Sequence, residues 1–287
     1  MPELPEVETI ARGLHKRVRG DVIESIWLGS KREPFKSPPT KIARTLENTR
    51  ISGVRRVGKH IVVDLQPVRT AKLSQRRPGR APSVAGGKPA QWIVHLGMTG
   101  RFLVCRPDEE VAKHTHAIAK LASGRELRFV DPRRFGRLSV AQDGNFNAAG
   151  YEPLEVELER FTALFRGRKT PIKSALLNQK LLSGVGNIYA DESLFRAGIR
   201  PKRRARSLTR EQLRKLYPAL REVLNEAIAL GGSSISDYVG ADGEEGFFQL
   251  QHRVYGREGE PCLVCKTPIK RIVIAGRSSH YCPTCQK

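Results

Sequence analysis

The sequence contains no apolar run that approaches the ~18 residues of a membrane-spanning helix. Its first nine residues include Glu3, Glu6 and Glu8, whereas a secretory signal begins with basic residues and continues with apolar ones. No basic amphipathic helix ends in a lipidation signal, and no internal repeat is present. We therefore expect a cytoplasmic protein that is not anchored to a membrane.

Acidic residues are few relative to basic ones. The chain has 29 Asp and Glu against 51 Lys and Arg, a formal net charge of +22 over 287 residues. This excess is larger than solubility requires and indicates a polyanionic partner, with nucleic acid favoured over an anionic membrane surface. Hydrophobic residues make up 39% of the chain, which excludes wholesale disorder, and the length suits two domains.

Cysteines are also few, and four of the five follow one spacing. Two C-x2-C pairs are separated by sixteen residues: Cys262, Cys265, Cys282 and Cys285. In a cytosolic chain such pairs are more often metal ligands than disulfides. Four sulfur ligands fill the coordination sphere of a tetrahedral metal ion and leave no position for water. We expect one structural Zn²⁺ per chain and a basic β-hairpin between the pairs that suits a DNA backbone. A redox dithiol is the weaker alternative, and Cys105 is expected to be an inert buried thiol.

The hydrophobic pattern of the sequence changes from strand-like to helix-like near the middle of the chain. A helix is expected from Pro5, and short runs at 22–28, 60–65, 91–104 and 126–130 are rich in Val, Ile and Leu, which predicts two packed sheets between 22 and 146. Beyond residues 150–159 the pattern predicts helices at 171–182, 187–197 and 209–230. The segment 67–90 has six basic residues, four prolines and no acid, so we interpret it as a disordered basic loop.

The glycine turn 184–186 lies between two of the expected helices. Asn187 then starts a helix whose N-terminus favours anions, and residues 196–206 downstream carry six basic side chains and no acid. A capped helical hairpin without a ligand is the alternative. The basic stretch favours contact with phosphates.

The first residues offer an unusual nucleophile. An initiator methionine is normally removed before a small residue such as Pro2, which would leave a secondary amine. An α-amino group has a pKa of roughly 8, so part of it is neutral near pH 7. Attack of such an amine on a sugar C1′ gives a cationic iminium, which acts as an electron sink.

Six motifs occur together in one order. They are MPELPEVET at 1–9, GKH at 58–60, HLGMTG at 95–100, DPRRFG at 131–136, GVGNIYA at 184–190 and the terminal four-cysteine hairpin. This set resembles the bacterial formamidopyrimidine-DNA glycosylase family, from Pro2 to Lys287. Each motif alone is modest, whereas the set is specific.

The resemblance implies an α+β fold and a DNA-repair enzyme. Residues 1–146 would form a β-sandwich with an N-terminal helix, 147–249 a helix–two-turns–helix domain and 250–287 a zinc finger, with damaged double-stranded DNA bound between them. Residues 67–90 would be an insertion, and 233–248 a loop that closes over the lesion. The implied activity is base-excision repair: a monomeric glycosylase and abasic-site lyase that removes oxidised purines and acts on nucleoid DNA.

The resemblance also assigns roles to residues. Pro2 would attack C1′, Glu3 would protonate the opening sugar, and Lys59 and Arg277 would serve β- and δ-elimination. Other positions match the family's DNA contacts: His114, Arg133, Arg168, Lys173 and Asn187. Met98, Arg133 and Phe135 would fill the gap left by an extruded base, which must leave the duplex before it can react.

Two other functions remain open from the sequence. The related endonuclease VIII type prefers oxidised pyrimidines, but Leu4 and the residues around Met98 and Phe135 favour the purine enzyme. A catalytically silent zinc protein that binds DNA is disfavoured because Pro2, Glu3 and Lys59 are all present.

Overall fold

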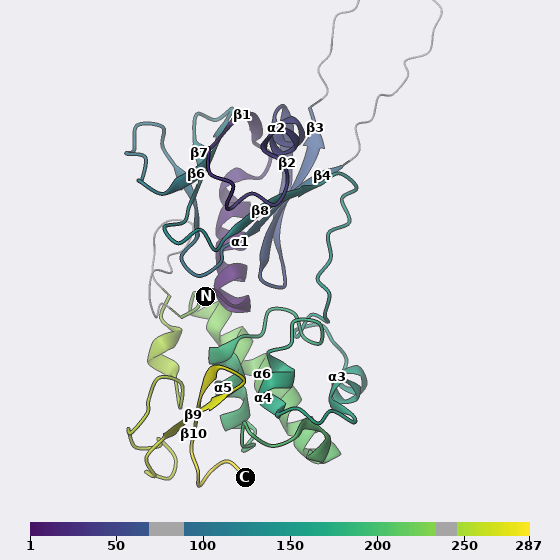
Figure 1. Ribbon diagram of the computed structural model, residues 1–287, viewed down its shortest axis with the longest axis vertical. Coiled ribbons are helices and arrows are strands. Elements are labelled where there is room, and N and C mark those ends of the chain that lie inside the picture. The colour runs from purple at the N-terminus through teal and green to yellow at the C-terminus, as the bar shows by residue number, and fades with distance from the viewer. Residues whose placement is uncertain (69–88, 234–245) are drawn as a thin grey trace, which may run out of the picture.

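The structure, a computed structural model, describes residues 1–68, 89–233 and 246–287. The chain forms an upper half made of sheet and a lower half made of helices and the C-terminal hairpin (Figure 1). Most of the expected basic loop 67–90 and of the expected closing loop 233–248 lies outside the described residues. None of the helices in the described part of the chain combines the length and the apolar character needed to cross a membrane.

The upper half is one antiparallel sheet that folds over itself. Its strands run in the order β5-β7-β6-β1-β2-β3-β4-β8, and β1 and β2 pair over only two residue pairs. Although β4 and β5 are far apart in this order, the rings of Trp92 and Phe102 lie 5.0 Å apart. The two predicted layers are therefore present, and a short strand pairing joins them. The strands are β1 (Val22–Leu28), β2 (Thr49–Val57), β3 (His60–Pro67), β4 (Ala90–His95), β5 (Arg101–Cys105), β6 (Thr115–Leu121), β7 (Glu126–Val130) and β8 (Arg137–Ala141).

Two features of the upper half differ from the sequence prediction. The expected run 91–104 is broken into β4 and β5 by a turn at 96–100, where Gly97 has a φ of +67°. The helix α2 (Pro39–Leu46) was not expected. The expected N-terminal helix is α1 (Leu4–Val18), which packs on β2 and buries Val7, Ile10, Ala11, Leu14 and Val18.

The lower half contains α3 (Leu158–Phe165), α4 (Ile172–Leu176), α5 (Asn187–Arg196) and α6 (Arg210–Ala229). The long predicted helix 209–230 is confirmed as α6, and Thr209 caps it by accepting a hydrogen bond from the Gln212 N–H. The predicted helix 171–182 is wrong beyond Leu176. There the side chain of Gln179 bonds to the backbone of Gly184 and Val185 and holds a turn instead. The short helix α3 was not expected.

The C-terminal hairpin has the predicted form. Strands β9 (Lys270–Ile274) and β10 (Arg277–Tyr281) pair in antiparallel register, and β10 packs against α5. Cys262 and Cys282 belong to a small core with Val254, Ile269 and Phe195 of α5. The hairpin is therefore fixed to the helical half.

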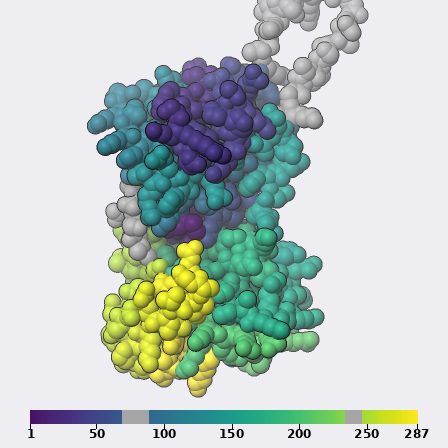
Figure 2. Space-filling model, viewed as in Figure 1, coloured from purple at the N-terminus to yellow at the C-terminus, as the bar shows by residue number. Residues whose placement is uncertain are grey.

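The N-terminus of α1 joins the two halves. Leu4 belongs to the hydrophobic core of the lower half, whereas Val7 and the residues after it belong to the core of the upper half. Beside them, Arg56 of β2 forms ion pairs with Glu8 and with Glu152, both at 2.8 Å. The first turn of α1 is thus held between the two cores, and Figure 2 shows it in purple directly above the yellow C-terminal hairpin.

Candidate functional site at the junction of the halves

Glu3, the residue before α1, lies at the start of α5. Its carboxylate accepts hydrogen bonds from the backbone N–H of Ile188 at 3.2 Å and of Tyr189 at 3.5 Å. The glycine turn makes this approach possible: a Cβ on Gly186 would lie 2.1 Å from Cδ of Glu3. The sequence predicted an anion at this helix N-terminus, and the structure places a carboxylate of the chain itself there.

Burial governs the protonation of Glu3. The side chain is 4% exposed, and burial raises its pKa to about 7 while the nearby Lys59 charge and the two N–H donors oppose that rise. A carboxyl with such a pKa is protonated in an appreciable fraction of molecules at neutral pH. It can therefore deliver a proton to an atom beside Pro2.

Glu6 fixes the geometry around Glu3. One of its oxygens accepts a hydrogen bond from the Glu3 N–H at 2.8 Å, and the other accepts from the Ser233 N–H at 2.8 Å and from the Tyr189 hydroxyl. This single carboxylate ties together α1, α5 and the residue from which the expected closing loop departs.

Lys59 faces the same cluster from the tight turn between β2 and β3. Gly58 precedes it with a φ of +59°, and Val57 pairs with His60 across the turn. Burial lowers the pKa of Lys59, whose side chain is 8% exposed; the charges of Glu3 and Glu6 oppose this, and that of Arg277 reinforces it. A lowered pKa increases the fraction of lysine present as the neutral amine, which is the form that can accept a proton.

Lys173 is buried rather than on the surface, and its contact with DNA stays a prediction. It is fully buried and forms an ion pair with Asp191 at 2.7 Å, and burial lowers its pKa. Its ammonium also donates to the Ser278 carbonyl at 2.5 Å, while Asp191 accepts from the His280 N–H at 2.8 Å. The pair therefore holds β10, which begins with the exposed Arg277.

Asn187 begins α5, as predicted, and its contact with DNA stays a prediction. The residue that caps α5 is Gly186 rather than Asn187, and the Asn187 side chain donates to the Ser278 hydroxyl at 3.2 Å. It therefore links α5 to the hairpin, close to the predicted contacts with DNA.

Met98, Arg133 and Phe135 come together on two adjacent turns of the upper half. Met98 is 44% and Phe135 53% exposed, and the Arg133 guanidinium lies 4.8 Å from the centre of the Phe135 ring. The fully buried Asp131 joins the turns, because it accepts from the Thr99 hydroxyl at 2.6 Å and the Gly136 N–H at 2.7 Å. The structure thus fixes exposed apolar side chains on a rigid support.

The two remaining predicted DNA contacts are exposed and lie apart from each other. The His114 carbonyl accepts from the Asp131 N–H at 3.0 Å, next to these turns. Arg168 follows α3, where its carbonyl accepts from the Arg206 N–H at 2.8 Å beside the basic stretch 196–206. Contact of His114 and Arg168 with DNA stays a prediction.

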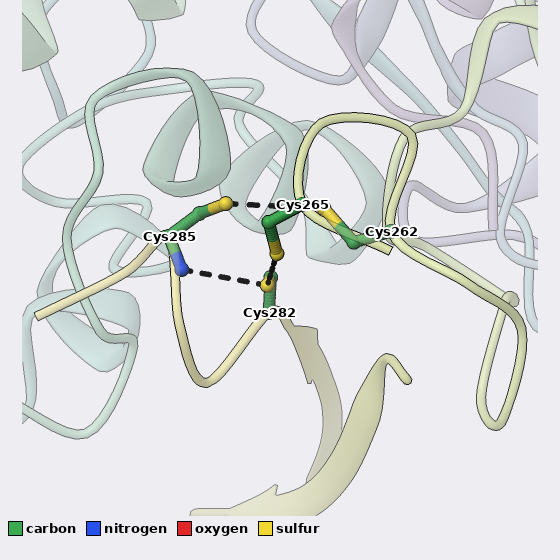
Figure 3. Close-up of side chains that lie close together, drawn as sticks. All are labelled: Cys262, Cys265, Cys282 and Cys285. Atoms are coloured by element: carbon green, nitrogen blue, oxygen red, sulfur yellow. Dashed lines mark hydrogen bonds between the residues drawn. The ribbon is translucent and has the colours of Figure 1, made fainter. Parts of the chain in front are cut away.

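The four cysteines form a compact cluster that fits zinc. Figure 3 shows their side chains converging from two loops, and all four sulfurs lie within 4.8 Å of one another. The Cys265–Cys282 and Cys262–Cys285 sulfur distances are 3.4 and 3.9 Å, close to the ~3.8 Å expected for sulfurs at tetrahedral corners about Zn²⁺. These four residues would hold one structural zinc that joins the hairpin to its preceding loop. Cys105 is buried on β5, as expected.

Sequence reasoning missed several residues that support the site. Asp191 and Glu192 are consecutive acids in α5, and both are fully buried. The Glu192 carboxylate accepts from three successive backbone N–H groups, those of residues 253–255. Burial raises the pKa of Tyr255, and the nearby Asn187 side chain opposes that rise. Their positions beside the motifs could have identified two of the supporting acids: Asp191 follows GVGNIYA directly, and Asp131 is the first residue of DPRRFG.

Three family models match the chain. The formamidopyrimidine-DNA glycosylase N-terminal domain matches residues 1–138, the H2TH domain of the same enzyme 149–239, and a zinc finger found in this enzyme and in IleRS 259–287. These ranges leave the expected basic loop inside the first match.

Curated and solved proteins agree with these models. Formamidopyrimidine-DNA glycosylases of Solibacter usitatus and Thermus thermophilus are each 45% identical to this chain. The alignments cover all of this chain and 100% and 98%, respectively, of the two relatives. The crystal structure of the Thermus thermophilus protein has a TM-score of 0.82 at 42% identity, covering 99% of this chain and 98% of that one. A Lactococcus lactis Fpg mutant in complex with DNA containing Fapy-dG has a TM-score of 0.85 at 32% identity over the whole of both chains. The chain therefore belongs to the formamidopyrimidine-DNA glycosylase family.

Proposed function

We propose that this protein excises oxidised purines from duplex DNA and then cleaves the resulting abasic site. The observation that carries the proposal is the buried Glu3 with a pKa of about 7, next to Pro2 and within the electrostatic reach of Lys59. Related Lactococcus lactis proteins have been crystallised with DNA that contains Fapy-dG or an abasic site. The enzyme acts as a monomer, on nucleoid DNA.

The first chemical step needs a free amine on Pro2. In the structure Met1 precedes it and is 49% exposed, so the proposal requires removal of Met1. The amine attacks C1′ and loses its proton, and the base leaves with the electron pair of the glycosidic bond. The C1′–O4′ bond then opens, Glu3 protonates O4′, and an iminium joins Pro2 to the sugar.

The elimination steps use the same iminium as an electron sink. Removal of a proton from C2′ expels the 3′ phosphate, and a second elimination expels the 5′ phosphate. In this proposal Lys59 serves the first of these steps and Arg277 the second. The products are a one-nucleotide gap with a phosphate at each end and a released sugar fragment.

Borohydride trapping tests this mechanism. Reduction of the iminium should give a stable adduct with an 8-oxoguanine duplex, and intact mass with peptide mapping should place it on Pro2. Pro2→Gly should lose the adduct. Trapping on a lysine side chain, or full activity in enzyme that retains Met1, would contradict the proposal.

Oxidised pyrimidines are the second candidate substrate. The related wild-type Lactococcus lactis protein has also been crystallised in complex with DNA that contains an oxidised pyrimidine. Parallel trapping on an oxidised-pyrimidine duplex separates the two: an adduct there alone supports the endonuclease VIII type of activity. No adduct on any lesion supports a protein that only binds DNA.

A further inference from the structure

The glycine turn 184–186 is buried, so its backbone must be satisfied by the protein itself. Val185 is 0% exposed, and the glycines on either side of it are buried as well. A buried backbone N–H or carbonyl without a hydrogen-bond partner costs free energy, because water cannot replace the missing bond. The conformation of this turn therefore depends on the groups that bond to it.

The Gln179 side chain supplies two of these bonds. Its carboxamide oxygen accepts from the Gly184 N–H at 2.9 Å, and its nitrogen donates to the Val185 carbonyl at 2.8 Å. The same nitrogen donates to the Leu177 carbonyl at 2.9 Å. Both amide protons and the amide oxygen are thus engaged, which ties the glycine turn to the chain that follows α4.

The glycine turn in its place holds the first residues of the chain. The Gly184 carbonyl accepts from the Leu4 N–H at 3.0 Å, and a Cβ on Gly184 would lie 2.9 Å from Cβ of Leu4. Gly186 lies directly against the Glu3 carboxyl, and the two backbone N–H groups that bind this carboxyl follow in the first turn of α5. A shift of the turn would therefore move the N-terminus of α5 relative to Glu3.

We propose that Gln179 is a positioning residue for the proton transfer by Glu3. The inference rests on the proposed function, in which Glu3 protonates O4′ of the sugar. Gln179 acts through the glycine turn: its three bonds fix the turn, and the turn fixes the carboxyl. Misplacement of a reacting group by about 1 Å can lower a rate by about 100-fold, so the loss of these bonds should slow the step that uses the Glu3 proton.

Two substrates separate this step from the rest of the reaction. Excision of 8-oxoguanine requires protonation of O4′, whereas the sugar of a preformed abasic site already exists in part as an open aldehyde and requires none. Gln179→Met keeps the length of the side chain and removes its hydrogen bonds. In this variant the ratio of the single-turnover excision rate to the rate of abasic-site cleavage should fall by about 10- to 100-fold.

Asn178→Ala is the matched control. Asn178 is the neighbouring exposed amide, and its side chain accepts from the Lys180 N–H at 3.0 Å, so it supports the same loop without bonding to the glycine turn. This variant should keep the ratio of the two rates. Affinity for lesion DNA, measured by fluorescence anisotropy, should be unchanged in both variants.

Three results would overturn the inference. They are normal excision by Gln179→Met, an equal loss of both rates in that variant, and a ratio that falls as far in Asn178→Ala. If Gln179→Met instead loses DNA affinity and reacts normally once saturated with DNA, Gln179 is a DNA contact and the inference is wrong.

A second variant covers the case in which Gln179→Met does not fold. Gln179→Glu keeps the acceptor for the Gly184 N–H and removes both amide donors, so it should lower the same ratio, and an unchanged ratio would contradict the inference. The unchanged protein in the same assays tests the proposed function separately. If it excises no 8-oxoguanine, the proposed function fails, whereas normal excision with no effect of the Gln179 variants refutes the positioning role alone.

Discussion

The two sides of the junction between the halves differ in what they bury. Around the first turn of α1 the structure buries ionisable groups, among them Glu3, Lys59 and Asp191. On the turns at 96–100 and 131–136 it exposes large apolar side chains, Met98 and Phe135. Both arrangements run against ordinary preferences, because buried charge and exposed apolar surface each cost free energy.

The free-energy cost of the buried charges and that of the exposed apolar side chains are offset in different ways. The difference indicates which function each side of the junction suits. The buried groups form opposed pairs and hydrogen bonds, so their charge and pKa values are controlled by neighbours. The exposed groups have no apolar cover, and only the support beneath them is fixed, by Asp131. The first side is suited to proton transfer and the second to contact with an apolar surface of a ligand, such as the bases on either side of an extruded nucleotide.

The largest expected effect concerns the proton of Glu3. Glu3→Gln keeps the shape of the side chain but removes the acid, so base excision should fall by about 10²- to 10⁴-fold while affinity for lesion DNA is kept. Single-turnover excision from an 8-oxoguanine duplex measures the first quantity and anisotropy the second. Glu8→Gln, on the same helix but directed at Arg12 and Arg56, should excise normally. Normal excision by Glu3→Gln would show that the proton comes from elsewhere.

The next effect concerns the buried pair beneath the hairpin. Asp191→Asn leaves the Lys173 ammonium buried without an opposite charge, which should lower the free energy of unfolding by about 3–5 kcal/mol. It should also loosen β10 and reduce the ratio of δ- to β-elimination products, because Arg277 begins that strand. Thermal unfolding and product gels measure the two effects.

Glu226→Gln is the control for Asp191→Asn. It breaks the Arg196–Glu226 pair between α5 and α6, whose glutamate is 49% exposed, so it should cost only about 0–1 kcal/mol. It should leave the product ratio unchanged. Equal destabilisation by the two substitutions would show that the buried Lys173–Asp191 pair contributes no more to stability than the exposed Arg196–Glu226 pair.

The sequence predicted the parts of the fold that follow from local pattern. The long helix α6 has apolar residues at helical spacing and a capping residue, and the hairpin follows from the cysteine spacing. The turn at 177–182 could not be predicted, because side chains of Gln179 and Asn178 compete with the helix for backbone groups. The two glycines at 97 and 100 are a local turn signal that the predicted run 91–104 passed over, and the contacts of Gly97 with residues 135 and 136 show why the chain turns there.

The site shows the same division between local and long-range information. The motifs identified Glu3, Lys59 and the cysteines, but a sequence does not show that Glu3 lies at the N-terminus of α5, 185 residues away. Lys173 illustrates the limit most clearly. The resemblance alone assigned it a contact with DNA, and the sequence does not show that Asp191 and Ser278 enclose it in the folded chain.

The buried side should also carry a pH-dependent cost in stability. The pKa of Glu3 is raised from 4.5 to about 7 on folding, so between these values the folded state holds a proton that the unfolded state has lost. Stability therefore falls as pH rises through this window, by up to about 3 kcal/mol relative to Glu3→Gln. Unfolding by denaturant at pH 5 and pH 8 measures this difference. A constant difference between the two proteins would mean that the carboxyl has an ordinary pKa.

The smallest effect belongs to the exposed side. Phe135→Ala removes an aromatic face that can replace lost stacking beside an extruded base, so affinity for lesion DNA should fall by about 1–3 kcal/mol, or 5- to 150-fold. Stability should hardly change, because the ring is 53% exposed. Trp27→Ala is the matched control, since Trp27 is 52% exposed on β1 and belongs to neither turn. If Phe135→Ala destabilised the fold and left DNA affinity intact, Phe135 would be a packing residue and the contrast with the buried side would be lost.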